Sequence, residues 1–135
     1  MIRKISFKLS VNAMLILLAL VLCYHLLILF ELIPYEIAWG GRLQNRSEMY
    51  VFETISIVIN LFIFTIVLIK GIHKQTIIPA KVVTILLWIF TAIFTLNTIG
   101  NLFSINSIEM IIFTPLTFVS ALFCYRMAIE KNGEE

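Results

Sequence analysis

Four long stretches without charged residues divide the chain, and they constrain its fold more than any other feature. The first runs from Leu9 to Phe30, and three more follow Glu53, Lys81 and Glu109. A helix needs about 20 predominantly apolar residues to cross a bilayer core, and each stretch approaches that length. We therefore predict an all-α, integral membrane four-helix bundle. Its topology should be up-down-up-down, because short connections force sequence neighbours to pack antiparallel.

The amino-acid composition indicates the same environment. Hydrophobic residues make up 61 % of the 135 residues and charged residues only 13 %, whereas soluble domains carry about 25 % charged residues. So few charges cannot cover the core of a soluble domain of this length. We predict one domain over residues 1–135, with spans at about 9–33, 49–69, 81–102 and 108–128.

Lysine and arginine are unevenly divided between the two ends of these spans. Eight of the ten lie in the N-terminal tail, the second connection and the C-terminal end, and the other two are Arg42 and Arg46 in the first connection. Connections rich in Lys and Arg stay in the cytoplasm. We predict a multi-pass protein of the cell (plasma) membrane with both termini cytoplasmic.

Several classes of function find no support in the composition. A net charge of +2, split along the chain, does not form a nucleic-acid-binding surface. All acidic residues are Glu, and they form no cluster at metal-ligand spacing, so we expect no metal site and no cofactor. Cys23 and Cys124 form no CxxC motif and lie at different depths, so we expect two free thiols buried among the helices.

Charge on the non-cytoplasmic side collects between Glu31 and Glu53, which holds four of the eight acidic residues. Pro34 should stop the first span, because proline lacks the N–H that the helix needs. Trp39 suits the headgroup level, where an amphipathic ring has one wet end. We interpret this stretch as the first outer loop, with a Glu at each flank that dips back toward the hydrocarbon.

Polar residues of three spans fall within the outer half of the predicted bundle. Helix rise places Glu31, Glu53, Asn97 and Asn101 there and Asn60 near the midplane. Intramembrane polar side chains turn inward, because lipid offers no hydrogen-bond partners. We therefore predict a polar pocket under the outer loop. Its candidate ligand-binding residues are Glu53, Asn60, Asn97, Asn101, Glu31, Arg42 and Trp39.

The glutamates and asparagines of the predicted pocket can also have purely structural roles. Glu31 and Glu53 can instead be interfacial carboxylates that pair with Arg42 or Arg46, and the asparagines can form hydrogen bonds between helices. His25 is expected to be a core histidine, because no carboxylate shares its face of the first span.

Two segments carry a resemblance to known sequences: IPYEIAWGGRLQNRSEMYVFETISIVIN and LNTIGNLF. They resemble uncharacterised small four-span membrane proteins of bacteria, and the resemblance covers most of the chain. It implies the same four-span architecture. It carries over no activity and no site residue.

Three functions follow from the predicted pocket. The first is non-enzymatic binding of an apolar or lipid-like molecule, with Glu53 and Asn60 as polar anchors and the bilayer as the other partner. The second is a proton- or ion-coupled small transporter subunit, which would act as a homodimer because four short helices enclose little volume. The third is a membrane enzyme that uses Glu31 and Glu53 as acid and base, which requires both carboxyls to face one cavity. No nucleophile motif or phosphate-binding loop supports an enzyme, so we favour binding.

Overall fold

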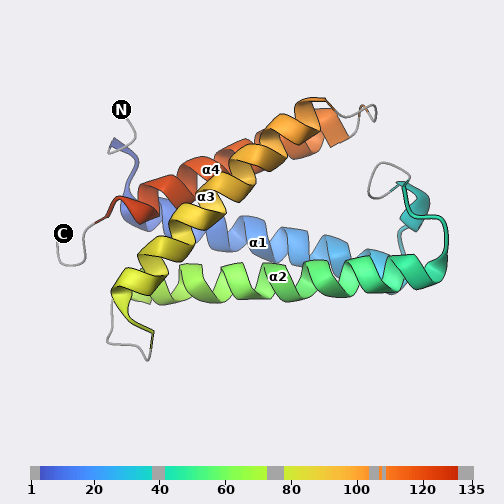
Figure 1. Cartoon of the computed structure of the whole chain (residues 1–135), viewed down its shortest axis with the longest axis horizontal. Coiled ribbons are helices and arrows are strands. Elements are labelled where there is room, and N and C mark those ends of the chain that lie inside the picture. The colour runs from blue at the N-terminus through green and yellow to red at the C-terminus, as the bar shows by residue number, and fades with distance from the viewer. Residues whose placement is uncertain (1–3, 38–41, 73–77, 104–106, 108, 131–135) are drawn as a thin grey trace.

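The computed structural model describes residues 4–37, 42–72, 78–103, 107 and 109–130, and it is an all-α four-helix bundle. Four helices form the bundle, with a 3₁₀ turn after the first and a π-helical segment directly before the fourth (Figure 1). These elements are α1 (Phe7–Leu29), η2 (Tyr35–Ile37), α2 (Arg46–Ile72), α3 (Ala80–Leu102), η4 (Glu109–Phe113) and α4 (Thr114–Ala128). Four stretches of this helical structure are long and apolar enough to cross a membrane, the fourth taken from Met110 to Ala128. The predicted fold class is confirmed.

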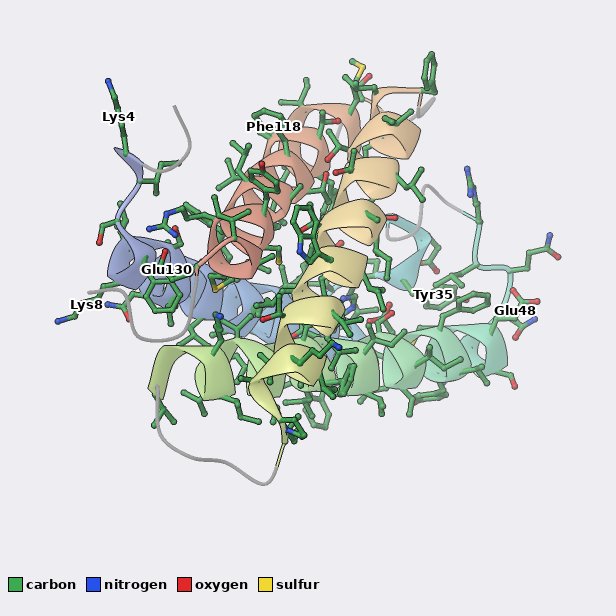
Figure 2. All side chains as sticks on the ribbon, turned by 60° about the vertical axis from the view of Figure 1, so that its left-hand side comes forward. Lys4, Lys8, Tyr35, Glu48, Phe118 and Glu130 are labelled. Atoms are coloured by element: carbon green, nitrogen blue, oxygen red, sulfur yellow. The ribbon has the colours of Figure 1, made fainter. Side chains whose placement is uncertain are left out.

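The helices give the bundle two distinct ends. The start of α1, the end of α2, the start of α3 and the end of α4 lie at one end, which we call the termini end (Figure 1). The connections from α1 to α2 and from α3 to α4 lie at the other, which we call the loop end. Figure 2 shows Lys4, Lys8 and Glu130 at the termini end and Tyr35 and Glu48 at the loop end.

Two antiparallel hairpins, α1 with α2 and α3 with α4, make up the bundle. They pack together at the termini end and diverge toward the loop end (Figure 1). The main buried core accordingly comes from the termini-end halves of all four helices. Its thirteen members are Phe7, Val11, Met14, Leu18, Ile63, Ile66, Val67, Val83, Leu87, Phe90, Cys124, Met127 and Ala128.

The two cysteines are free and lie in different environments. Cys124 is buried within this core, whereas Cys23 is exposed. The prediction that both thiols are buried among helices is therefore wrong for Cys23, which faces away from the neighbouring helices.

Polar contacts close the core at the termini end. Arg126 donates a hydrogen bond from Nε to the carbonyl oxygen of Ile5, at 2.7 Å, and pairs with the carboxylate of Glu130. Lys70 donates from Nζ to the carbonyl oxygen of Glu130, at 3.1 Å. Both basic side chains are buried. These contacts tie the ends of α2 and α4 to the segment that precedes α1.

The first helix ends at Leu29, before Pro34 is reached. Glu31 adopts a positive φ of 57°, and its N–H bonds to the carbonyl of Ile28. The N–H of Leu32 bonds to the carbonyl of Leu27. This pair of bonds is a Schellman motif, which satisfies the last carbonyls of a helix. The helix therefore ends at this backbone cap, which forms at a position that glycine usually occupies. Pro34 is not the cause.

The second helix begins earlier than predicted, at Arg46. The side-chain oxygen of Asn45 accepts a hydrogen bond from the N–H of Glu48, at 2.9 Å, and the Glu48 carboxylate accepts one from the N–H of Gln44, at 3.0 Å. Asparagine at this position caps a helix by accepting one of its unpaired N–H groups. The loop-end start of α2 is thus fixed by its own side chains.

Threonines join α3 to α4 near the loop end. Thr98 Oγ1 lies 3.0 Å from Thr117 Oγ1. Each hydroxyl also lies 2.8 Å from a carbonyl oxygen one turn earlier, so the two protons are shared among these three contacts. In α4, Pro115 lies in the first turn, directly after the π-helical segment. Proline removes a backbone donor, and the change from π to α geometry takes place where that donor is missing.

Candidate functional site

A hydrogen bond between a histidine and a buried carboxylate joins α1 and α2 in the loop-end half. Glu53 is 0 % exposed, and its Oε2 lies 2.6 Å from Nδ1 of His25. His25 lies about 6 Å before the end of α1, and Glu53 lies about 10 Å after the start of α2, at ~1.5 Å per residue. Because the helices are antiparallel, the two side chains meet at a similar depth. A buried carboxylate requires such a partner, since an unpaired charge in an apolar environment is very costly.

The interpretation of His25 as a core histidine did not consider a carboxylate from another span. It compared residues on the face of one helix, whereas the partner comes from the neighbouring helix. The usable signal was depth: in an antiparallel hairpin, a residue near the end of one span lies level with a residue near the start of the next. His25 is the candidate site residue that the sequence analysis missed.

Apolar and aromatic side chains enclose the pair. One turn closer to the loop end, Ile28 and Met49 pack together with Leu43 in a separate buried cluster. The Tyr24 ring lies 5.9 Å from the His25 ring and 6.0 Å from the ring of Phe113, between centroids. Tyr24 therefore links the pair to the segment that precedes α4. The pair sits within the bundle, away from the headgroup level.

Asn60 lies two turns further along α2, on the same face as Glu53. It is 6 % exposed, and its Oδ1 accepts no hydrogen bond from any residue that the structure describes. On α4, the buried Oγ1 of Thr114 is also unpartnered among those residues. A buried polar atom without a partner costs about 1–3 kcal/mol. The interior thus offers Asn60 as an acceptor that a hydroxyl, amine or amide could satisfy.

Glu31 belongs to a separate polar group at the loop end. Its Oε2 lies 3.0 Å from Nη2 of Arg46, and the Tyr50 hydroxyl donates to its Oε1, also at 3.0 Å. All three residues are exposed, as is Arg42. Glu31 is therefore an interfacial carboxylate paired with Arg46. The structure does not bring it, or Arg42, to Glu53.

The remaining predicted site residues divide among three outcomes. Asn101 is half-buried and donates from Nδ2 to Thr117, at 3.4 Å, so it belongs to the contact between α3 and α4. Asn97 is exposed and points away from the interior, contrary to the expectation that it lines a pocket. Trp39 lies outside the described residues. Of the seven predicted residues, Glu53 and Asn60 remain as buried polar groups on one face.

Metal-binding chemistry has no counterpart in the described part of the chain. There, no three His, Cys, Asp or Glu side chains come close enough together to hold a metal ion. The His25–Glu53 pair supplies one nitrogen and one carboxylate, which are already bonded to each other.

No family model, curated protein or solved structure matches this chain. The resemblance to bacterial four-span proteins therefore stays a prediction. Function has to be inferred from the geometry of the His25–Glu53 pair and Asn60.

Proposed function

We propose that this multi-pass membrane protein binds an amphipathic, lipid-like molecule within the loop-end half of its bundle. The His25–Glu53 pair and Asn60 are the polar anchors. The observation that carries the proposal is the buried, unpartnered Oδ1 of Asn60 on the same face as a buried carboxylate. The ligand is apolar along most of its length and carries a hydrogen-bond donor, such as a hydroxyl or an amine.

The chemistry of the face supports this class of ligand. The unpartnered amide atom is an acceptor, and a carboxylate also accepts hydrogen bonds or attracts a cation. The side chains next to the His25–Glu53 pair are apolar or aromatic, and small-molecule sites are typically apolar with a few well-placed polar groups.

Mass spectrometry of lipids that stay bound through purification tests the proposal. The wild type should retain a lipid with a hydroxyl or amine headgroup above the level of the bulk extract. Asn60→Leu should reduce that retention about 10-fold, because it removes the acceptor while keeping a similar volume. Asn97→Leu is the matched control, since it makes the same change on the exposed face of another helix, and it should retain the lipid.

Two results would overturn the binding proposal. One is a wild-type protein whose bound lipids match the bulk extract in composition. The other is an Asn60→Leu variant that retains the same lipid as well as the wild type does. Helical circular dichroism of each variant shows that the bundle is intact, so a folding defect is not mistaken for loss of ligand.

The His25–Glu53 contact also favours a second function, a proton-coupled small transporter. A histidine hydrogen-bonded to a carboxylate holds a proton between the two groups, and such pairs serve as relays in pumps and transporters. Proton-driven uptake or proton leak in reconstituted vesicles, lost in Glu53→Gln, supports this function. Against it, the thirteen-residue apolar core occupies the termini-end half and contributes no titratable group except the Cys124 thiol.

For the location of the protein, we propose the plasma membrane with the termini end in the cytoplasm. Eight Lys and Arg residues belong to that end by their position in the chain, against Arg42 and Arg46 at the other. This asymmetry follows the positive-inside rule. Labelling of cysteines placed next to Lys4 and Glu48 with an impermeant reagent in intact cells tests it: only the Glu48 position should react.

A further inference from the structure

Asn97 carries an amide side chain within a membrane-spanning helix. This side chain is not covered by the rest of the described protein. It is exposed, and no residue in the described ranges forms a hydrogen bond with it. It lies about 8 Å before the end of α3 at Leu102, inside the apolar span. Lipid tails offer no hydrogen-bond partner, so polar groups at such positions usually face other protein.

The direction of α3 prevents Asn97 from reaching the nearer headgroups. In a helix, the Cα–Cβ bond tilts toward the N-terminus. The N-terminus of α3 is at the termini end, so the Asn97 side chain leans deeper into the hydrocarbon. A short amide side chain at this position therefore stays within the apolar layer.

Other exposed polar residues of the spans do not point deeper into the hydrocarbon as Asn97 does. Asn12 lies about 8 Å from the start of α1 and leans toward the termini-end surface, because that is where its helix begins. Thr54 leans toward the loop-end surface for the same reason, and a threonine hydroxyl can also bond to a carbonyl of its own helix. For Asn97, the side chain points into the apolar layer, and its amide has no hydrogen-bond partner there among the described residues. Both facts favour a partner from another protein chain.

Gly100 opens the same face of α3 to close approach. It lies one turn from Asn97, and a Cβ added there would meet no described atom within 4 Å. Exposed apolar side chains, Ile93 and Leu96, flank the two positions. Glycine lets helix backbones come close together, which strengthens both packing and hydrogen bonds between helices in membranes. The neighbouring side of α3 already contacts α4, since Thr98 lies about 100° around the helix from Asn97 and bonds to Thr117.

We propose that two copies of this chain associate through this face of α3, with Asn97 of one copy hydrogen-bonded to Asn97 of the other. A carboxamide is both donor and acceptor, so it is complementary to itself. A two-fold symmetric interface places the same patch on both subunits and suits a self-complementary group near the axis. The Gly100 positions allow the two α3 helices to approach closely enough for that contact.

Fluorescence energy transfer between labelled copies in lipid vesicles, measured as the protein-to-lipid ratio is lowered, tests the dimer. Asn97→Leu should raise the dissociation constant about 10-fold, because the two weak hydrogen bonds that are lost between the membrane helices together contribute about 1.4 kcal/mol. Gly100→Leu should abolish transfer by blocking close approach. Asn97→Gln, which keeps the amide, should weaken association less than Asn97→Leu does.

Two matched variants separate this dimer from the ligand site. Asn12→Leu removes an exposed asparagine from α1, and Asn60→Leu removes the buried one from α2; both should dimerise like the wild type. A wild type that shows no transfer above random encounter overturns the proposal. So does an Asn97→Leu variant with the same dissociation constant as the wild type. Neither result bears on lipid retention, so the two proposals fail separately.

Discussion

The termini-end and loop-end halves of this bundle use the same four helices in opposite ways. In the termini-end half, thirteen buried apolar residues from all four helices form one core, which Arg126 and Lys70 close. In the loop-end half, the separate apolar cluster has only three buried members, Ile28, Leu43 and Met49. The His25–Glu53 pair of the hairpin α1–α2 lies beside that smaller cluster.

This difference separates close apolar packing from the buried His25–Glu53 pair along the length of the bundle. Close packing holds helices together in lipid, where the hydrophobic effect between them is absent. The termini-end core supplies that packing. The loop-end half holds the His25–Glu53 pair, which contributes little net stability and which the proposed function assigns to ligand binding.

The largest expected effect comes from breaking the buried pair in the loop-end half. His25→Leu removes the imidazole that bonds to the buried Glu53 carboxylate and should lower the free energy of unfolding by about 3–5 kcal/mol. The double variant His25→Leu/Glu53→Leu removes both polar groups and should return close to wild-type stability. Reversible unfolding in mixed detergent micelles measures both. Additive losses in the double variant would contradict a direct coupling between the two residues.

A smaller effect is expected from cavities, and it should differ between the two halves. Leu87→Ala opens a space in the thirteen-residue core and should cost about 2–3 kcal/mol, at the low end for such changes because unfolded helices stay in lipid. Met49→Ala opens a space in the three-residue cluster, where neighbours can collapse into it, and should cost less. The same unfolding assay compares them. Equal losses would show that the halves are packed alike.

The smallest effects on stability are expected from substitutions at two glycines. Gly71 lies against α1, and Gly100 lies on the exposed surface of α3. A Cβ at Gly71 would lie 2.6 Å from Cγ1 of Val11, so Gly71→Ala should cost about 1–2 kcal/mol through displacement of α1. Gly100→Ala adds a methyl group to open space and should leave the stability of the monomer within ~0.5 kcal/mol of the wild type. A harmless Gly71→Ala would mean that Val11 moves aside without loss of packing.

Much of the fold was predictable because lipid imposes simple rules on sequence. Apolar length and the spacing of charges identified four helices and their order, since a backbone in hydrocarbon must satisfy its hydrogen bonds within each helix. The ends of the helices were less predictable. The cap at Glu31 depends on a backbone conformation that glutamate rarely adopts, and a sequence pattern does not reveal it.

The candidate site was predicted in part. Glu53 and Asn60 are buried on one face, as helical spacing indicated. His25 was missed, and Asn97 was placed on the wrong side of α3, because spacing within one helix does not say which face meets a neighbour. Both errors concern the rotation of one helix relative to another.

The sequence by itself determined that the chain is a four-helix membrane protein and how deep each polar residue lies. Only the tertiary structure decided which of those residues meet. Depth follows from helix rise and the length of each apolar span, which are local quantities. Contact depends on how four nearly uniform apolar surfaces pack, and small differences in packing at Gly71, Thr98 and the termini-end core set that rotation.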